Sequence, residues 1–138
     1  MKKFLFVLLA AITVFGVTSC GKSALEKDIE VSREDCPINI GVPGMSVTDI
    51  YLDGNNVVYE VEVDEDIYDL DELESMKHIL AQTMAEALEE EKDFDPDYYT
   101  FLKLVTDENK NVVYRYIGDT YKDHFDVMIP LAKLQRML

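Results

Sequence analysis

The chain has 138 residues, with 28 acidic against 13 basic side chains and a formal charge of −15 at pH 7. A polyanion of this density repels phosphate groups, so nucleic acid is excluded as an expected partner. The length suits a single domain, which can bury enough surface to fold without a disulfide or a metal ion.

The first 20 residues consist of three successive parts. Lys2 and Lys3 form a basic start, residues 4–17 are mostly apolar, and small residues then lead to Cys20. The apolar run is shorter than the roughly 20 residues that cross a bilayer, and it matches the core of a signal peptide. The lysines supply the positive charge that orients such a segment.

Val17-Thr18-Ser19-Cys20-Gly21 resembles the lipobox of bacterial lipoproteins, which the lipoprotein signal peptidase cuts before the cysteine. The resemblance implies that Cys20 becomes the mature N-terminus and carries a diacylglyceryl thioether and an N-acyl chain. Two chains give stable membrane anchoring. Ordinary secretion and a retained membrane helix are the alternatives, but Val17 fits poorly before an ordinary secretory cleavage site.

We therefore expect a signal peptide at residues 1–19, a lipidated N-terminus and tether at residues 20–35, and one domain at residues 36–138. Loss of Lys2 and Lys3 changes the formal charge to −17, which should hold the domain away from anionic head groups. Bacteroides-type lipoproteins that reach the cell surface have acidic residues directly after the cysteine, whereas Gly21 and Lys22 follow here. This departure favours the periplasmic side of the outer membrane.

Two strands are predicted in the first half of the domain, at residues 45–52 and 57–63. The turn residues at 53–56 join them as a hairpin. Val57, Tyr59, Val61 and Val63 alternate with other residues that include two glutamates, so the second strand has one apolar face. Prolines and glycines at residues 37–44 predict an extended edge segment before the hairpin.

Two helices follow. Apolar residues recur at helical spacing over residues 70–91 and predict the longest helix, with Asp69 as its cap. This stripe contains Leu73, Met76, Ile79, Leu80, Met84, Ala87 and Leu88. Asp95-Pro96 predicts the start of a second helix, which runs to about Thr106.

Strands at residues 112–117 and 124–129 and a short helix after Pro130 complete the domain. The predicted fold class is α+β: a two-layer sandwich of a four-stranded antiparallel sheet with two main helices on one face, in the order β-β-α-α-β-β-α. Residues 36–129 also resemble domains of small lipoproteins from Bacteroides-like bacteria, which implies fold and location but no activity. The motifs are Cys36-Pro37, Gly44-Met45, Asn56-Val57-Val58-Tyr59, Val63-Asp64-Glu65 and Val113-Tyr114-Arg115-Tyr116.

Catalytic motifs are scarce in this sequence, which has no HExxH, CxxC, GxSxG or glycine-rich phosphate loop. If Cys20 is acylated, Cys36 is an unpaired thiol, and burial without reactivity is the usual fate of such a residue. His78 is expected at the surface of the long helix. A hydrolase or thiol enzyme that uses Cys36 with His124 is retained as an alternative function.

Two acidic clusters make calcium binding a second alternative. The candidate ligands are Asp64, Glu65, Asp66, Asp69 and Asp71, and Asp93, Asp95 and Asp97. Neither cluster matches an EF-hand loop, because Asp69 and Tyr98 replace the glycine at the sixth place. Helix capping explains these acids without a metal.

The eight tyrosines suggest one further surface. Tyr114 and Tyr116 share a strand face with Tyr121 beyond them, and these three form the candidate binding face for a peptide or glycan; packing in the core is the competing interpretation. The sequence thus predicts a lipid-anchored, non-catalytic binding module of the cell envelope. We expect a membrane contact through acyl chains, an envelope protein, peptide or glycan as partner, and no cofactor besides the lipid on Cys20.

Overall fold

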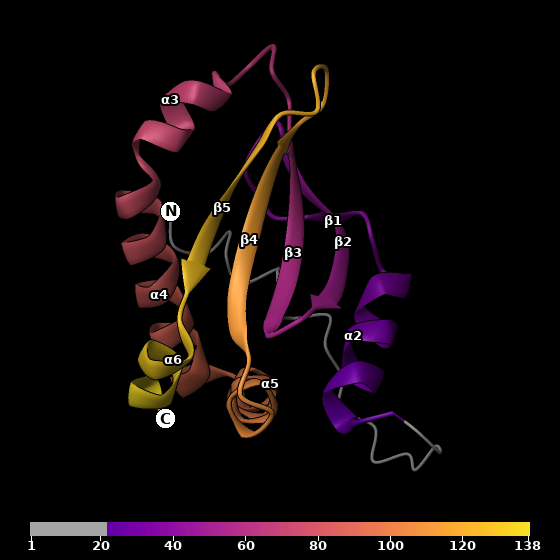
Figure 1. The fold of residues 1–138 in the computed structure, drawn as a ribbon, viewed down its shortest axis with the longest axis vertical. Helices are drawn as coiled ribbons and strands as arrows, with labels where there is room; N and C mark the ends of the chain where they lie inside the picture. The colour runs from indigo at the N-terminus through magenta and orange to yellow at the C-terminus, as the bar shows by residue number, and fades with distance from the viewer. Residues whose placement is uncertain (1–21) are drawn as a thin grey trace.

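The computed structural model describes residues 22–138, so the predicted signal peptide and Cys20 lie outside the described residues. A five-stranded sheet forms the centre of the fold (Figure 1). The elements are α2 (Ala24–Glu34), β1 (Ile38–Asn39), β2 (Met45–Asp53), β3 (Asn56–Val63), α3 (Leu70–Ser75), α4 (Lys77–Phe94), α5 (Pro96–Asp107), β4 (Asn111–Gly118), β5 (His124–Ile129) and α6 (Leu131–Met137).

The strands lie in the order β1-β2-β3-β4-β5. The two predicted hairpins, β2–β3 and β4–β5, are confirmed as antiparallel pairs. The prediction of a purely antiparallel, four-stranded sheet is wrong, because β3 and β4 pair in parallel from Asn56↔Asn111 to Val63↔Gly118. The three helices α3, α4 and α5 form a long crossover, which returns the chain to the end of the sheet where β3 began. The short β1 adds a fifth strand beside β2.

The predicted tether at residues 20–35 is wrong from Ala24 onward, because Ala24–Glu34 forms helix α2. Ser23 caps this helix by accepting a hydrogen bond from the Glu26 N–H. Leu25 and Ile29, which are one helical turn apart, are buried in the core. The domain therefore begins before residue 36, and its first helix takes part in the packing that stabilises it.

The predicted helix over residues 70–91 is divided at Met76, whose backbone (φ −102°, ψ 13°) separates α3 from α4. Leu73 in α3 and Met84 and Leu88 in α4 are buried as predicted. Ile79 is 64% exposed and Met76 is also exposed, so the inward stripe is interrupted at the junction of α3 and α4 and resumes at Met84. The caps predicted at Asp69 and Asp95 are confirmed, since both carboxylates accept backbone N–H bonds.

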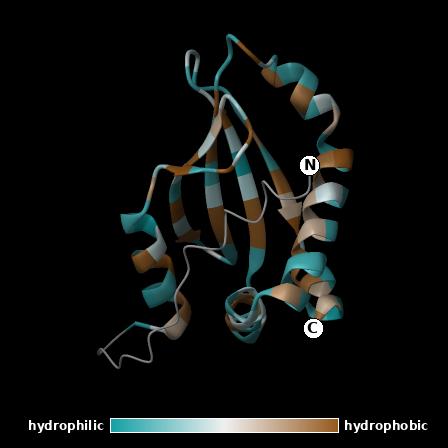
Figure 2. Cartoon of the chain, turned by 180° about the vertical axis from the view of Figure 1, so that it is seen from behind, coloured by the Kyte–Doolittle hydropathy of each residue, from teal (hydrophilic) through white to brown (hydrophobic). Residues whose placement is uncertain are grey.

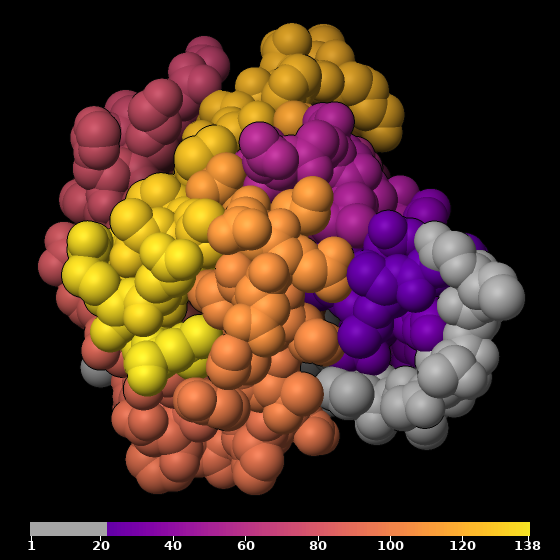
Figure 3. All heavy atoms as spheres, turned by 60° about the horizontal axis from the view of Figure 1, so that its bottom comes forward, coloured from indigo at the N-terminus to yellow at the C-terminus, as the bar shows by residue number. Residues whose placement is uncertain are grey.

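The helices all pack on one face of the sheet. Their buried residues join a single core with the strand residues of that face, and Figure 2 shows hydrophobic and hydrophilic bands alternating along the strands. Tyr59 stacks on Tyr114 at 5.4 Å between ring centroids, and Phe101 from α5 meets Tyr59 edge-on at 6.4 Å. Figure 3 shows α5 (orange) between α6 (yellow) and α2 (indigo) at one end of the molecule.

Candidate binding surface

The second face of the sheet is formed by the alternate strand residues, which lie outside the common core. We call it the open face and define it by Ser46, Tyr51, Val58, Glu60, Glu62, Val113, Arg115, Ile117, His124, Asp126 and Met128. Among residues 22–138, the side-chain hydrogen bonds of Tyr51, Glu60, Arg115 and Asp126 on this face all join different strands.

A hydrogen-bonded row crosses the open face from β2 to β5. The Tyr51 hydroxyl donates to Glu60 Oε2 at 2.6 Å and accepts from Arg115 Nη1 at 3.1 Å. Arg115 also donates from Nε and Nη2 to both carboxylate oxygens of Asp126, at 2.9 and 3.1 Å. Burial and the hydrogen bond to Glu60 raise the pKa of Tyr51 to about 12. The row is therefore a fixed arrangement at neutral pH, and a bidentate pair of this kind holds its geometry well.

An apolar row lies next to the polar one. The strand register aligns Tyr51, Val58, Val113 and Met128 across β2, β3, β4 and β5. Val58 and Val113 are buried at its centre, whereas Met128 at the β5 end is 48% exposed. The accessible apolar surface of this row is therefore contributed by Met128 and the half-buried Tyr51, next to the fixed polar groups, and such a mixture of polar and apolar groups occurs in protein-binding surfaces.

The predicted binding face of Tyr114, Tyr116 and Tyr121 is wrong. Tyr114 and Tyr116 are 1% and 3% exposed and belong to the helix-covered core, where Tyr116 stacks on Phe125 at 5.0 Å. Tyr121 is 76% exposed in the β4–β5 loop. The competing interpretation as core packing is correct for the two strand tyrosines, and Tyr51 is the tyrosine of the open face.

Sequence alternation alone did not identify the residues of the polar row. It places Glu60 and Arg115 on the same side of their strands as Val58 and Val113, but the row exists only because β3 and β4 are neighbours in parallel register. The missing information is the strand order. The sequence signal for this row was Arg115, which stands between Tyr114 and Tyr116 in one strand. If both tyrosines face the core, the arginine must lie on the opposite face of the sheet.

A shallow cavity of about 560 Å³ lies at the end of the open face, where the β1–β2 connection meets the sheet. Ser46, Glu62, Asp64 and Asp119 contribute its polar side chains together with Asn39. The cavity lining, within the described part of the chain, contains neither histidine nor cysteine.

The acidic clusters have structural partners. Glu65 Oε2 accepts the backbone N–H groups of Thr120 and Tyr121 at 2.8 and 3.0 Å, and the Glu65 N–H donates to Asp119 Oδ1. This contact lowers the pKa of Asp119. Over residues 22–138, no group of three or more histidine, cysteine, aspartate or glutamate side chains is arranged to hold a metal ion.

Glu65 reaches the loop through a close approach to Gly118, where an added Cβ would lie only 2.6 Å from Glu65 Cδ. We call the hydrogen bonds from Thr120 and Tyr121 to Glu65 the loop clamp, because they join the β3–α3 and β4–β5 loops. Glycine at position 118 leaves the space that the Glu65 side chain needs to make them.

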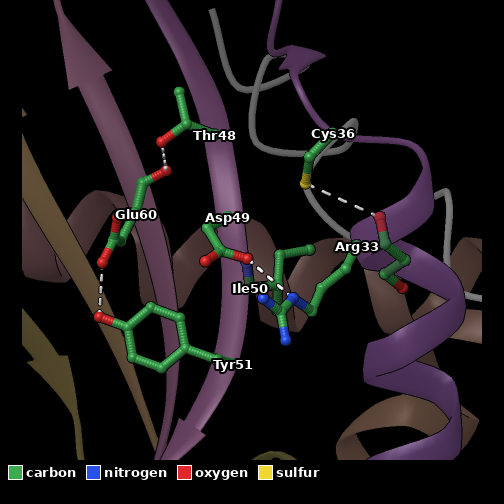
Figure 4. Close-up of polar contacts among 8 residues, drawn as sticks. Arg33, Cys36, Thr48, Asp49, Ile50, Tyr51 and Glu60 are labelled. Carbon is green, nitrogen blue, oxygen red and sulfur yellow. Dashed lines mark hydrogen bonds and ion pairs between the residues drawn. The ribbon is translucent and has the colours of Figure 1, made fainter.

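Cys36 and His124 lie at opposite edges of the sheet. Cys36 directly precedes β1, and His124 begins β5, so about four strand spacings of roughly 4.8 Å separate them. His78 is exposed on α4, which packs against β5. The Cys36 thiol donates to the Ser32 carbonyl at 3.7 Å (Figure 4), and burial and the nearby Asp49 raise its pKa. These positions rule against a Cys36–His124 pair and against an activated thiolate.

An ion pair fastens α2 beside the sheet. Arg33 Nε donates to Asp49 Oδ1 at 2.9 Å, and the same oxygen accepts the Ile50 N–H. Figure 4 shows this pair next to Tyr51 and Glu60. β1 therefore pairs with the start of β2, and α2 packs against β2 and is held there by the Arg33–Asp49 pair.

Comparisons with known proteins show a similar fold but no family. No protein-family model and no curated protein matches the chain. A Pseudomonas aeruginosa protein described as secreted has a similar structure, with a TM-score of 0.61 and 12% identity over 80% of this chain and 88% of that one. The pilotin EpsS of the Vibrio vulnificus type 2 secretion system gives a TM-score of 0.46 and 16% identity over the same shares. The first comparison supports the α+β fold. Among residues 22–138, no helix is long and apolar enough to cross a bilayer.

Proposed function

We propose that this protein is a lipid-anchored component of the bacterial cell envelope and acts there as a non-catalytic binding module. Its anchor is Cys20, and its site is the open face of the sheet. The observation that carries the binding function is that the helices of residues 22–138 pack on one face of the sheet, while the other face presents a fixed polar row beside the exposed Met128.

The chemistry of the described residues supports binding over catalysis. Arg115 is held by Asp126 and Tyr51, so its donors are already oriented. The carboxylates of the loop clamp are engaged by backbone N–H groups. Groups that are preorganised and partnered in this way contribute to recognition without a proton or electron to transfer.

The lipid anchor and the periplasmic side of the outer membrane belong to the same proposal. They rest on the signal-peptide pattern before Cys20 and on Gly21 and Lys22 after it. The acidic domain, with its charge of the same sign as anionic lipid, is expected to stand off the membrane to which it is tied.

Labelling with radioactive palmitate tests the anchor, and in-cell crosslinking followed by mass spectrometry tests the binding function. The Cys20→Ser variant is the control for both. We expect label on the natural protein alone, and a reproducible crosslinked partner that is lost when the anchor is removed. Label on the variant would refute the anchor, and an absence of any partner for the labelled protein would refute the binding module.

A further inference from the structure

The strand β5 is the last strand of the sheet on the side away from β1. It pairs with β4 through the register Val112↔Ile129 to Ile117↔His124. Within residues 22–138, no strand pairs with its other edge. α4 packs against β5, but the backbone groups on this edge have no strand partner, and an edge of this kind is a template for an additional strand.

The direction of the backbone groups on this edge follows from the hairpin. The Gly118 N–H donates to the Asp123 carbonyl at 2.9 Å, which makes Gly118 and Asp123 a hydrogen-bonded pair. Such pairs alternate along an antiparallel ladder. The N–H and C=O groups of His124, Asp126 and Met128 therefore point away from β4, toward the free edge.

A groove borders the start of this edge. Its volume is about 330 Å³, and it lies between α3 and the beginning of β5. Leu70 and Phe125, whose side chains are largely buried, form its apolar lining. Met76, between α3 and α4, and Ile79 on α4 are exposed. Figure 1 shows α3 and α4 alongside β5. An extended chain on the β5 edge would thus meet backbone donors and acceptors next to a mainly polar groove.

The charge around the groove selects the occupant. Its lining contains three acidic side chains, Asp71, Glu74 and Asp123, and one basic side chain, Lys122, together with His124. A second copy of this chain would bring another strongly negative domain to the same place, so pairing of two β5 edges is opposed by like charge. A basic segment is complementary.

We propose that the free edge of β5 binds an extended, basic segment of a partner protein as an additional strand of the sheet. This inference rests on the proposed binding function and names the partner's chemistry. The backbone of His124, Asp126 and Met128 supplies the hydrogen bonds, and the acidic groove beside α3 receives the basic side chains.

The test measures binding of fluorescent peptides to the full lipidated protein in non-ionic detergent. The probes are a short peptide of alternating lysine and valine and its counterpart of alternating glutamate and valine. Met128→Pro removes an outward N–H without removing a bond to β4, and Met128→Ala is the matched control that keeps the N–H. Thermal unfolding establishes that each variant is folded.

We expect the lysine peptide to bind the natural protein and Met128→Ala alike, and to bind Met128→Pro at least about tenfold more weakly. The double variant Asp71→Lys/Glu74→Lys, which leaves the edge intact, should weaken binding by a similar factor of about ten. Equal binding to Met128→Pro and Met128→Ala would refute strand addition. Equal binding of the glutamate peptide, or a dimer through β5, would refute the basic partner. An in-cell partner crosslinked elsewhere would leave the proposed function in place while this inference fails.

Discussion

Asp28 gives the sharpest prediction about stability. It lies on α2, is 2% exposed, and its Oδ2 has no hydrogen-bond partner among the described residues. Burial and the charge of Asp97 raise its pKa from 3.8 to about 6. The folded state therefore favours the neutral carboxyl group, and ionisation at neutral pH costs stability.

The sign and size follow from linkage. Because the folded pKa exceeds the unfolded one, the contribution of Asp28 is fully present below pH 3.8 and is lost as the pH rises through about 6. A difference of about 2 pKa units corresponds to about 3 kcal/mol at most, and about 1–3 kcal/mol is expected after partial screening by solvent. The change in the free energy of unfolding caused by Asp28→Asn should thus be more stabilising at pH 7.5 than at pH 4.

Urea unfolding at both pH values measures this difference. Asp35→Asn is the control, since it removes the same charge from an exposed position at the end of α2. The quantity to compare is the change in unfolding free energy between the two pH values for each variant. If Asp28→Asn shows the same pH dependence as the natural protein and the control, burial does not raise the pKa of Asp28 and the reasoning is refuted.

Two further predictions concern the core and the loop clamp. Tyr114→Ala should destabilise the protein by about 3–5 kcal/mol because it removes a buried, stacked ring, while Tyr121→Ala should change stability by less than about 0.5 kcal/mol; comparable losses in urea unfolding would contradict the placement of these tyrosines. Glu65→Ala should cost about 1–2 kcal/mol because two loop N–H groups lose their acceptor, and a cost no greater than that of Asp66→Ala in thermal unfolding would show that the clamp is not formed.

The sequence was sufficient to predict those features that depend on local chemistry. The hairpin at residues 53–56, the caps at Asp69 and Asp95, and the alternation of Val57 to Val63 each follow from neighbouring residues, and each is confirmed. The parallel pairing of β3 with β4 was not predictable in this way, because it depends on how three helices cross the sheet.

The errors in the candidate site have the same origin. Alternation in β4 is equally compatible with Tyr114 facing the core and with Arg115 facing it instead, because apolar residues occupy both sides of the strand. The structure resolves this ambiguity: Asp126 and Tyr51, which come from separate strands, hold the arginine on the open face. The helix at Ala24–Glu34 was missed because its apolar positions are few and its charged residues are many.

The central claim, that the open face of an anchored envelope protein binds a partner, is tested most directly by photocrosslinking in the cell. A photoreactive residue replaces Glu62 on the open face, or Gln135 on α6 as the control position, with the anchor intact. The account predicts a discrete crosslinked species from position 62 that is absent from position 135. The same species from both positions, or from position 135 alone, would contradict it.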